Sequence, residues 1–259
     1  MVPASVSSTP PALDVLSEDD YVRSRTAPSI YNRDYLHLSD LAQLLRAVVT
    51  TVTGDVFDYG SGGSPYISFF EKRRSYIAGD LATGPRVDRV LRQDGLTNEP
   101  NSSYDFILST QVLEHVKRPQ DYLKECHRLL RIGGQILLTT HGMVEEHGCP
   151  DDYHRWTSRG LEESLKEHGF IVLNSGKLTT QVRGIIQLVN QLIVHLHSKE
   201  HRALNPIFSL VRKMYFKLLM PILNRVADSF NSQRVVNNPS DDSIYTAVFV
   251  HAEKSKSDL

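Results

Sequence analysis

The sequence has little cysteine: its 259 residues include two, Cys126 and Cys149. Two cysteines cannot form a disulfide framework, which points to a reducing compartment. The chain also lacks an excess of charge, since 29 Lys and Arg stand against 30 Asp and Glu, for a formal net charge of −1. This balance excludes nucleic-acid binding driven by the charge of the whole chain, so we expect no nucleic-acid partner.

Long apolar runs are absent as well. No stretch reaches the roughly 18 consecutive apolar residues that a transmembrane helix needs. Residues 1–20 have neither a basic start nor an apolar core, so we expect no secretory signal or transit peptide. These absences predict a cytoplasmic protein. Residues 1–20 are rich in Pro, Ser, Thr and acidic residues, and we predict a disordered tail there.

Beyond this tail, short apolar runs that resemble buried strands alternate with segments of helical period. The predicted strands occupy 56–59, 76–78, 87–91, 104–108, 135–139, 170–173 and 244–250, and the predicted helices 31–53, 119–130 and 157–169. Ser39 is the expected cap of the first helix, and Gly133-Gly134 is expected to end the second. The pattern predicts an α/β fold with a doubly wound, Rossmann-like parallel sheet, whose core spans residues 21–175.

Residues 176–243 break this alternation and are predicted to form a basic helical insertion, before a last strand and tail at 244–259. Between 176 and 230 the chain carries eight Lys or Arg and two acidic residues, a balance of +6. Apolar residues recur at helical spacing at Ile207, Leu210, Val211, Met214, Leu218, Ile222 and Val226. Two interpretations are open: a lid packed on the core or on a second subunit of a homodimer, or a helix on an anionic membrane surface. The two can coexist if the substrate is lipid-linked.

The first chemical signal is a glycine turn directly after a strand. Gly60 and Gly62, with Ser61 between them, allow close approach of the backbone to a ligand, and the next helix offers N–H donors. Asp80 ends the following strand, where a carboxylate accepts hydrogen bonds from ribose hydroxyls. Asp94 ends the third strand, beside the expected place of an adenine amino group. Together they predict an adenosyl ligand at the carboxyl edge of the sheet; alternatively, both aspartates are solvated turn residues.

Two residues favour S-adenosylmethionine over a dinucleotide as this ligand. A dinucleotide fingerprint has the pattern Gly-x-Gly-x-x-Gly, and Pro65 stands at its last position. Asp58 would repel a pyrophosphate, whereas it would attract the α-amino group of a methionine moiety. The sequence therefore counts against an NAD-dependent enzyme.

With these residues the chain resembles the class I S-adenosylmethionine-dependent methyltransferases, in particular the methyltransferase type 11-like group. The resemblance covers residues 31–173 and resumes at the last strand, and its motifs are VFDYGSGGS at 56–64, YDFILSTQVLEHV at 104–116 and LLRIGG at 129–134. This chain has Ser64 in place of a third glycine, and Ile132 where proline is commoner. The resemblance implies an antiparallel last strand, normally joined to the sixth by a short hairpin, so that 176–243 is an insertion.

The resemblance also implies the cofactor, S-adenosylmethionine, and its binding residues. These are Asp58, Tyr59, Gly60, Ser61, Gly62, Asp80, Leu81, Asp94, Gly95, Thr110 and Gln111. The variant GSGGSPY at 60–66 and the run DYHRWT at 152–157 resemble a branch associated with polysaccharide, O-antigen and lipid-linked glycan biosynthesis.

Methyl transfer from a sulfonium is an in-line displacement, which depends mainly on holding acceptor and methyl group together. A sugar hydroxyl acceptor also needs a general base, because its pKa is far above 7. Glu114 and His115 follow the fourth predicted strand, and His141 follows the fifth. We favour His141 as the base, since it leaves the sheet where the acceptor should approach. The alternative is a loop histidine bonded to backbone.

The loop after His141 holds further candidates. His154 and Arg155 are expected to bind an acidic or sugar substrate, with Trp156 either as a stacking platform or as a plug between helix and sheet. The spacing of His141, His147, Cys149, Asp151 and His154 matches no structural zinc pattern, so we expect no metal.

These observations predict O-methylation of a glycan or of another hydroxylated small-molecule or lipid-linked acceptor. A C-methyltransferase of a quinone-like lipid would share the cofactor motifs and the basic helices. A non-catalytic cofactor-binding scaffold of the same fold is a third hypothesis, against which the intact Asp58, Gly60, Gly62 and Asp80 argue. If the acceptor is a lipid, the predicted place of the protein is peripheral, at the inner membrane surface.

Overall fold

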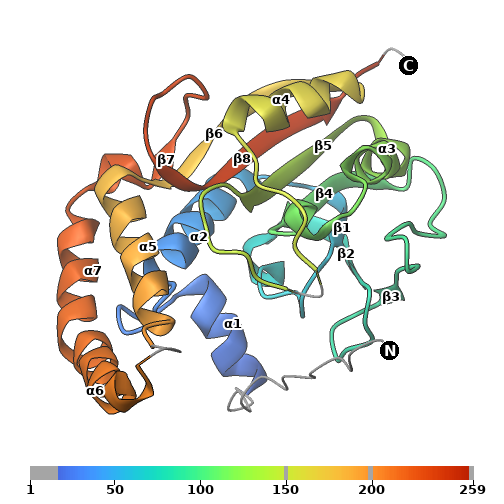
Figure 1. Cartoon of the computed structure of the whole chain (residues 1–259). Coiled ribbons are helices and arrows are strands. Elements are labelled where there is room, and N and C mark those ends of the chain that lie inside the picture. The colour runs from blue at the N-terminus through green and yellow to red at the C-terminus, as the bar shows by residue number, and fades with distance from the viewer. Residues whose placement is uncertain (1–16, 149–150, 198–200, 257–259) are drawn as a thin grey trace, which may run out of the picture.

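The computed structural model describes residues 17–148, 151–197 and 201–256, and its centre is one eight-stranded sheet of order β3-β2-β1-β4-β5-β8-β6-β7 (Figure 1). The strands are β1 Gly54–Tyr59, β2 Arg73–Asp80, β3 Arg89–Val90, β4 Tyr104–Thr110, β5 Leu130–His141, β6 Phe170–Thr180, β7 Val235–Val236 and β8 Tyr245–Lys254. The pairs among β1–β5 are parallel, and β8 is antiparallel to its neighbours β5 and β6. The predicted α/β class, parallel sheet and antiparallel last strand are confirmed.

Helices cover both faces of this sheet. They are α1 Glu18–Thr26, α2 Tyr35–Val49, α3 Pro119–Leu129, α4 Ser158–Glu167, α5 Gln181–Val194, α6 Asn205–Met214 and α7 Met220–Asp228. One apolar core joins α3 and α4 to the sheet, with Leu123 and Leu161 fully buried. The other joins α2 to the opposite face through Leu41 and Leu45. Burial on both faces explains why the strand runs are apolar throughout.

The sheet reverses direction of winding at β1, which lies between β2 and β4. In such open sheets ligands bind outside the carboxyl ends of the strands at this switch point. The glycine turn that follows β1, the end of β2 and the end of β4 therefore meet at one edge.

Several local predictions were wrong, each because of a specific local interaction. Residues 18–20 were predicted as tail but form the first turn of α1, whose N-cap Ser17 accepts a hydrogen bond from the Asp20 amide. The acidic first turn suits a helix N-terminus; residues 1–16 of the predicted tail lie outside the described residues. Ser39 lies inside α2, not at its cap, because the helix begins at Tyr35. Gly133-Gly134 belongs to β5, since α3 already ends at Leu129.

A buried ion pair and its hydrogen bonds hold the predicted insertion against the core. Strand β6 runs through the expected boundary at 175, and its end leads directly into α5. Arg183 of α5 is fully buried and donates to both carboxylate oxygens of Asp40 in α2, at 2.6 and 3.0 Å. The same guanidinium donates to the Ala227 carbonyl of α7 at 2.7 Å. Helices α5 and α7 are thereby held at the end of the sheet beside β6 and β7 (Figure 1).

Within the residues that the structure describes, no helix is both long and apolar enough to cross a bilayer.

Candidate active site

A cleft of about 940 Å³ opens at the carboxyl edge of the sheet, between the glycine turn, α1, α2 and α5. It brings together residues that the sequence separates by more than eighty positions. The predicted residues on its walls are Tyr59, Gly60, Ser61, Gly62, Asp80, Leu81, Asp94, Gly95, Thr110, Gln111, His115 and His141. Those that the structure places outside its lining are Asp58, Glu114, His154, Arg155 and Trp156.

The glycine turn is shaped by close backbone approach. Gly60 has φ +82°, and a Cβ added there would lie 2.5 Å from a methyl group of Val112. The Gly60 and Ser61 amides both donate to the Gly79 carbonyl of β2, which fixes the turn to the next strand. The Gly62 amide donates to the Asp80 carboxylate at 2.8 Å. The turn and the predicted ribose-binding acid thus form one unit.

Asp58, predicted at the methionine amino group, is not among the residues that line the cleft. Its carboxylate is buried and accepts a hydrogen bond from the Tyr76 hydroxyl at 2.7 Å. Burial raises the pKa of Asp58 to about 7. Its contact with the cofactor stays a prediction.

The end of the cleft beside Asp94 and Gly95 suits an aromatic nucleobase. The Tyr59 hydroxyl donates to the Gly95 carbonyl at 2.5 Å, which holds the segment after β3 against β1. Asp94 accepts from its neighbours Arg92 and Leu96, and so stays at the mouth of the cleft. The side chain of Leu81 is 41% exposed and offers an apolar surface beside them. These residues lie where the adenine was expected.

Sequence reasoning missed helix α1 as part of the site. Tyr21 and Arg25, one helical turn apart, line the cleft above the glycine turn, and the Tyr21 hydroxyl donates to the Gly62 carbonyl at 2.5 Å. The available signal was the Ser17 cap followed by an acidic turn, which marks a helix within the predicted tail.

Removing this hydroxyl tests whether α1 closes the cleft. Tyr21→Phe is expected to weaken S-adenosylmethionine binding by about 0.5–1.5 kcal/mol, the usual contribution of one hydrogen bond. Isothermal titration against wild type measures the effect, with Tyr31→Phe, an exposed tyrosine outside the cleft lining, as control. Equal affinity of wild type and Tyr21→Phe would contradict a closing role.

A carboxylate–imidazole pair lies at the opposite end. Oε1 of Glu114 is 3.2 Å from Nε2 of His141, and its Oε2 accepts from the Thr140 hydroxyl at 2.7 Å. Glu114 is fully buried, whereas the His141 ring lines the cleft. The Nδ1 atom of His141 is buried without a hydrogen-bond partner among the described residues. A buried nitrogen without a partner in a polar cleft is suited to accept a hydrogen bond from a substrate hydroxyl.

Burial changes the protonation of both members of this pair. It raises the pKa of Glu114 to about 7, because the ionised form is desolvated. It holds the pKa of His141 well below its ordinary value, aided by the neighbouring imidazoles of His37 and His147. The imidazole is therefore neutral around pH 7, as a general base must be. Oε1 of Glu114 has no hydrogen-bond partner among the described atoms and faces Nε2, so a proton on Nε2 would point at this oxygen and leave Nδ1 as the acceptor.

His115, the other predicted catalytic histidine, has a different setting. Its Nδ1 lies 2.6 Å from the Asp151 carbonyl, and its Nε2 is 4.0 Å from Glu114. It lines the cleft at the end of the short helix Leu113–His115, with its ring 5.1 Å from that of His147. Its bond to the loop carbonyl favours a role in ordering that loop.

The predicted substrate residues instead build the loop wall. Arg155 donates to both carboxylate oxygens of Asp152 and to the Glu145 carbonyl, at 2.5 to 2.7 Å, so its guanidinium is already engaged. The His154 amide donates to the Glu114 carbonyl. Trp156 packs against the apolar core and donates its amide to the His141 carbonyl at 2.9 Å. Of the two interpretations of Trp156, the structure fits the plug.

The acceptor end of the cleft has polar walls that no motif indicated. They come from α2 and α5 and include Asp34, His37, Gln187 and Gln191. Burial lowers the pKa of His37 to about 4, so its ring is neutral, and its centroid lies 5.8 Å from that of His141. The side-chain oxygen of Gln191 is buried without a partner among the described atoms. Residue pairs such as His37 and Gln187 meet only through tertiary packing, which explains why no local pattern indicated these walls.

The part of the chain that the structure describes contains no group of three or more His, Cys, Asp or Glu side chains that could hold a metal ion. Cys149, one of the weighed ligands, lies outside the described residues.

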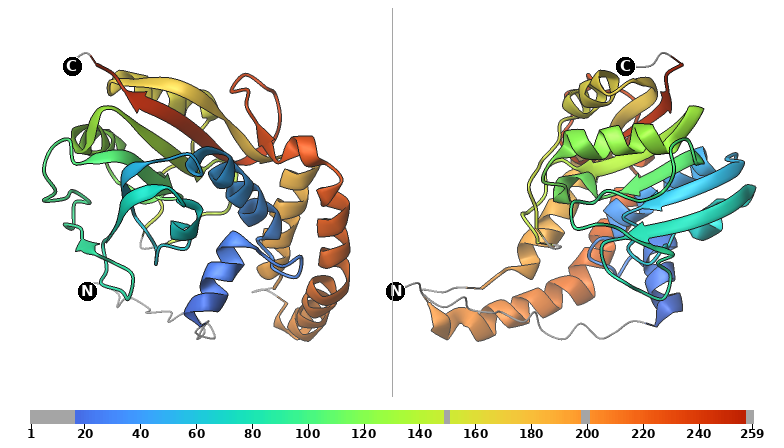
Figure 2. Two further views of the ribbon diagram at one scale, coloured as in Figure 1. Left: turned by 180° about the vertical axis from the view of Figure 1, so that it is seen from behind. Right: turned by 90° about the vertical axis from the view of Figure 1, so that its right-hand side faces the viewer.

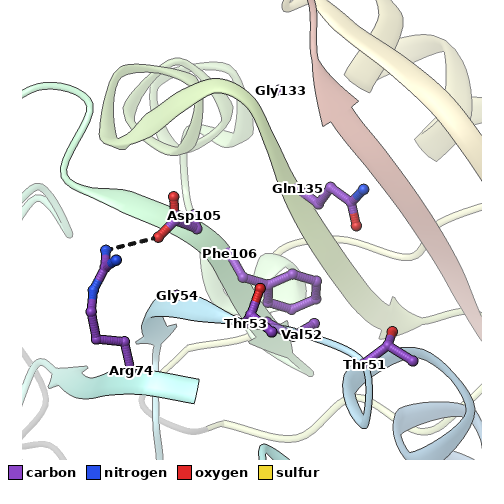
Figure 3. Close-up of a pocket in the computed structure, with 9 residues that line it drawn as sticks. All are labelled: Thr51, Val52, Thr53, Gly54, Arg74, Asp105, Phe106, Gly133 and Gln135. Carbon is purple, nitrogen blue, oxygen red and sulfur yellow. Dashed lines mark hydrogen bonds and ion pairs between the residues drawn. The ribbon is translucent and has the colours of Figure 1, made fainter. Parts of the chain in front are cut away.

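A second hollow, of about 570 Å³, lies at the amino ends of the strands (Figure 3). Arg74 and Asp105 pair there at 3.3 Å, and Gly54 and Gln135 lie on its walls. It is at the edge opposite the glycine turn and contains none of the predicted site residues. Because ligands of such sheets bind at the carboxyl edge, we assign the site to the larger cleft.

Comparison with known proteins agrees with this geometry. A family model described as a methyltransferase domain matches residues 31–175, more than half of the chain. The chain therefore belongs to the methyltransferase domain family, which confirms the resemblance to methyltransferases drawn from its motifs, while the polysaccharide and O-antigen branch stays a prediction. The ubiquinone biosynthesis O-methyltransferase of Pseudomonas paraeruginosa is 28% identical over 100 residues, 33% of this chain and 43% of that protein. That of Dechloromonas aromatica is 34% identical over 61 residues, 23% and 26% of the two chains. The chain thus matches less than half the length of these relatives.

Solved structures show the same fold at low identity. The 1,6-didemethyltoxoflavin-N1-methyltransferase of Burkholderia thailandensis superposes with a TM-score of 0.51 at 16% identity, over 92% of this chain and 87% of that chain. The cyclase SpnF superposes with a TM-score of 0.53 at 17% identity, over 85% and 82%. A cyclase among the neighbours shows that the fold by itself does not fix the reaction.

Proposed function

We propose that this protein is an S-adenosylmethionine-dependent O-methyltransferase in which His141 is the general base and Glu114 its positioning residue. The single observation that carries the proposal is the buried Glu114–His141 contact of 3.2 Å, placed in the same cleft as the glycine turn and Asp80. A general base at this edge of the sheet can take the proton of an acceptor hydroxyl. Family membership and the O-methyltransferase names of the relatives support it.

The residues present fit the cofactor. Asp80 offers a carboxylate for ribose hydroxyls, and the turn at Gly60, where a side chain would collide with Val112, keeps the backbone of the turn on the cleft wall. The hydroxyl of Ser61 and the side-chain oxygen of Gln111 are buried on the cleft walls without a partner among the described residues. They would hold polar groups of the methionine part. When bound, S-adenosylmethionine supplies an electrophilic methyl group on a sulfonium.

The chain's own residues supply position and a proton acceptor. Glu114 holds the neutral imidazole of His141 with Nδ1 free, and this atom takes the proton of the acceptor hydroxyl as the methyl group is transferred. Trp156 and the Arg155–Asp152 pair hold the loop that carries His147 over the base. Glu114 is fully buried, so its carboxylate is shielded from water.

The acceptor class follows from the walls of the cleft. The side-chain oxygen of Gln191, buried without a partner among the described atoms, offers a hydrogen bond to an acceptor hydroxyl, whereas Gln187 and Asp34 beside it are bonded to each other. This oxygen supports a glycan or another hydroxylated acceptor, free or lipid-linked. A C-methyltransferase of a quinone-like lipid is the second candidate. The relatives named ubiquinone biosynthesis O-methyltransferase support the quinone-like acceptor but not transfer to carbon.

Methyl transfer from labelled cofactor to an extract separated into polar metabolites, glycans and lipids tests this proposal. We expect label in a hydroxylated fraction, stable to base as an ether. Label on ring carbon of a quinone fraction would favour the second candidate. Cofactor binding without label in any fraction would contradict both and indicate a binding scaffold.

The pH profile of turnover tests the roles of the pair. Since the pKa of Glu114 is raised to about 7, we expect turnover to be full above this pH and to fall as the pH drops through it, when the protonated carboxyl imposes the wrong tautomer on His141. Glu114→Gln should remove this acid limb and lower the plateau. A flat wild-type profile between pH 6 and 8 would contradict the assignment.

A further inference from the structure

Helices α6 and α7 expose an apolar stripe on the outside of the molecule. Its members are Ile207, Leu210, Met214, Leu218, Ile222 and Val226, each 50–59% exposed. We call this surface the α6–α7 face. Figure 2 shows the two helices as one rod at the margin of the molecule, with its outer side turned away from the sheet. An apolar stripe of this length on a folded chain marks an interaction surface.

The geometry keeps the stripe on one side of the rod. Its members are three or four residues apart, and the π-helical turn Tyr215–Leu219 joins α6 to α7 without interrupting it. The inner side of the rod makes hydrogen bonds to the rest of the protein. The Tyr215 hydroxyl donates to Asn190 of α5 at 2.7 Å, and Asn224 donates to the Ile30 carbonyl at 2.8 Å. The outer stripe stays half or more exposed. This exposure favours a surface that meets another partner over a lid whose apolar side covers the core.

The charged residues of α6 and α7 indicate what kind of partner binds the α6–α7 face. Lys213, Lys217 and Arg225 are exposed, and each directly precedes a member of the stripe, so the three border it on one side. The acidic residue of α6–α7 is Asp228, which is held by Arg234 and Tyr35 at 2.6 Å. A second copy docked through the same face would oppose basic residues to basic residues. An anionic lipid surface supplies the missing countercharge and accepts the apolar stripe.

We propose that the α6–α7 face docks on an anionic bilayer surface, with the rod in the plane of the membrane and the stripe at the boundary of headgroups and acyl chains. Helix α5 packs against α7 and lines the cleft through Gln187 and Gln191, so docking holds the acceptor end of the cleft near the lipid. The proposal does not depend on the chemistry of the site, because its readout is binding.

Flotation of the full chain with vesicles tests the docking. With phosphatidylcholine vesicles containing a quarter of phosphatidylglycerol, we expect binding at low salt that weakens at high salt, since screening weakens the basic contacts. Vesicles of phosphatidylcholine alone should bind much less. Absence of binding to the anionic vesicles at low salt would overturn the proposal, as would equal binding to both kinds.

Paired variants separate charge from apolar contact. Lys213→Gln with Lys217→Gln should lower the partition constant about thirtyfold, since each basic residue near an anionic surface contributes about 1 kcal/mol and 1.4 kcal/mol is tenfold. Lys72→Gln with Lys124→Gln, two exposed lysines elsewhere, is the matched control. Leu210→Ser with Met214→Ser should lower it more than tenfold. Ile132→Ser with Ile171→Ser, exposed on the sheet, is its control.

Sedimentation without lipid tests whether a second copy of the chain covers the α6–α7 face. A concentration-dependent dimer that Leu210→Ser with Met214→Ser dissociates would show that a second copy covers the face, and would overturn the proposal. A monomer that binds anionic vesicles only through the unsubstituted face supports it.

Discussion

Replacing His141 by alanine is expected to lower methyl-transfer turnover by about 10²–10⁴-fold, the usual contribution of a general base. Affinity for S-adenosylmethionine should stay close to wild type, because His141 lies at the acceptor end and the glycine turn is held by other contacts. Single-turnover rates with saturating cofactor measure the first effect and calorimetric titration the second.

Two comparisons make this result specific to His141. His115→Ala removes an imidazole that lines the same cleft but is bonded to the Asp151 carbonyl, and should cost much less turnover. Full turnover of His141→Ala would remove His141 from the mechanism. A large loss in His115→Ala in its place would transfer the role of base to His115.

Replacing Asp80 by alanine is expected to weaken S-adenosylmethionine binding by about 2–4 kcal/mol, through loss of two charge-assisted hydrogen bonds to the ribose. The variant also releases the Gly62 amide, which Asp80 accepts at 2.8 Å, so part of the loss reflects a looser turn. Asp80→Asn keeps an acceptor for Gly62 and separates the two effects. Glu71→Ala, an exposed carboxylate outside the cleft lining, is the control. Unchanged affinity of Asp80→Ala would show the ribose assignment to be wrong.

The sheet and its functional edge could be predicted from sequence because the signals are local. Apolar runs without alternation predict strands covered on both faces, and Gly60 followed at a strand end by Asp80 predicts an adenosyl site. The structure brings both to the same cleft. Boundaries were less predictable: Gly133-Gly134 signals a helix end, but α3 already ends at Leu129, and the two glycines lie in the irregularity of β5 between the pairs Tyr104–Leu130 and Phe106–Gln135.

The walls of the cleft were only half predictable, because packing decides which side chains reach them. His141 and His115 follow strand ends and could be found from the chain. Asp58 has the residue type and position of a ligand contact, yet it is buried, bonded to Tyr76 and absent from the cleft lining. Arg155 has the residue type of a substrate anchor, but its guanidinium forms an ion pair with Asp152, three residues before it. The contribution of α5 depends on Arg183 meeting Asp40, 143 positions apart.

Calorimetric titration of the purified chain with S-adenosylmethionine and, separately, with NAD decides whether the cleft is an S-adenosylmethionine site. We expect one binding site for S-adenosylmethionine, weakened by about 2–4 kcal/mol in Asp80→Ala, and no binding of NAD. Absence of S-adenosylmethionine binding, or binding of NAD that Asp80→Ala abolishes, would contradict this assignment.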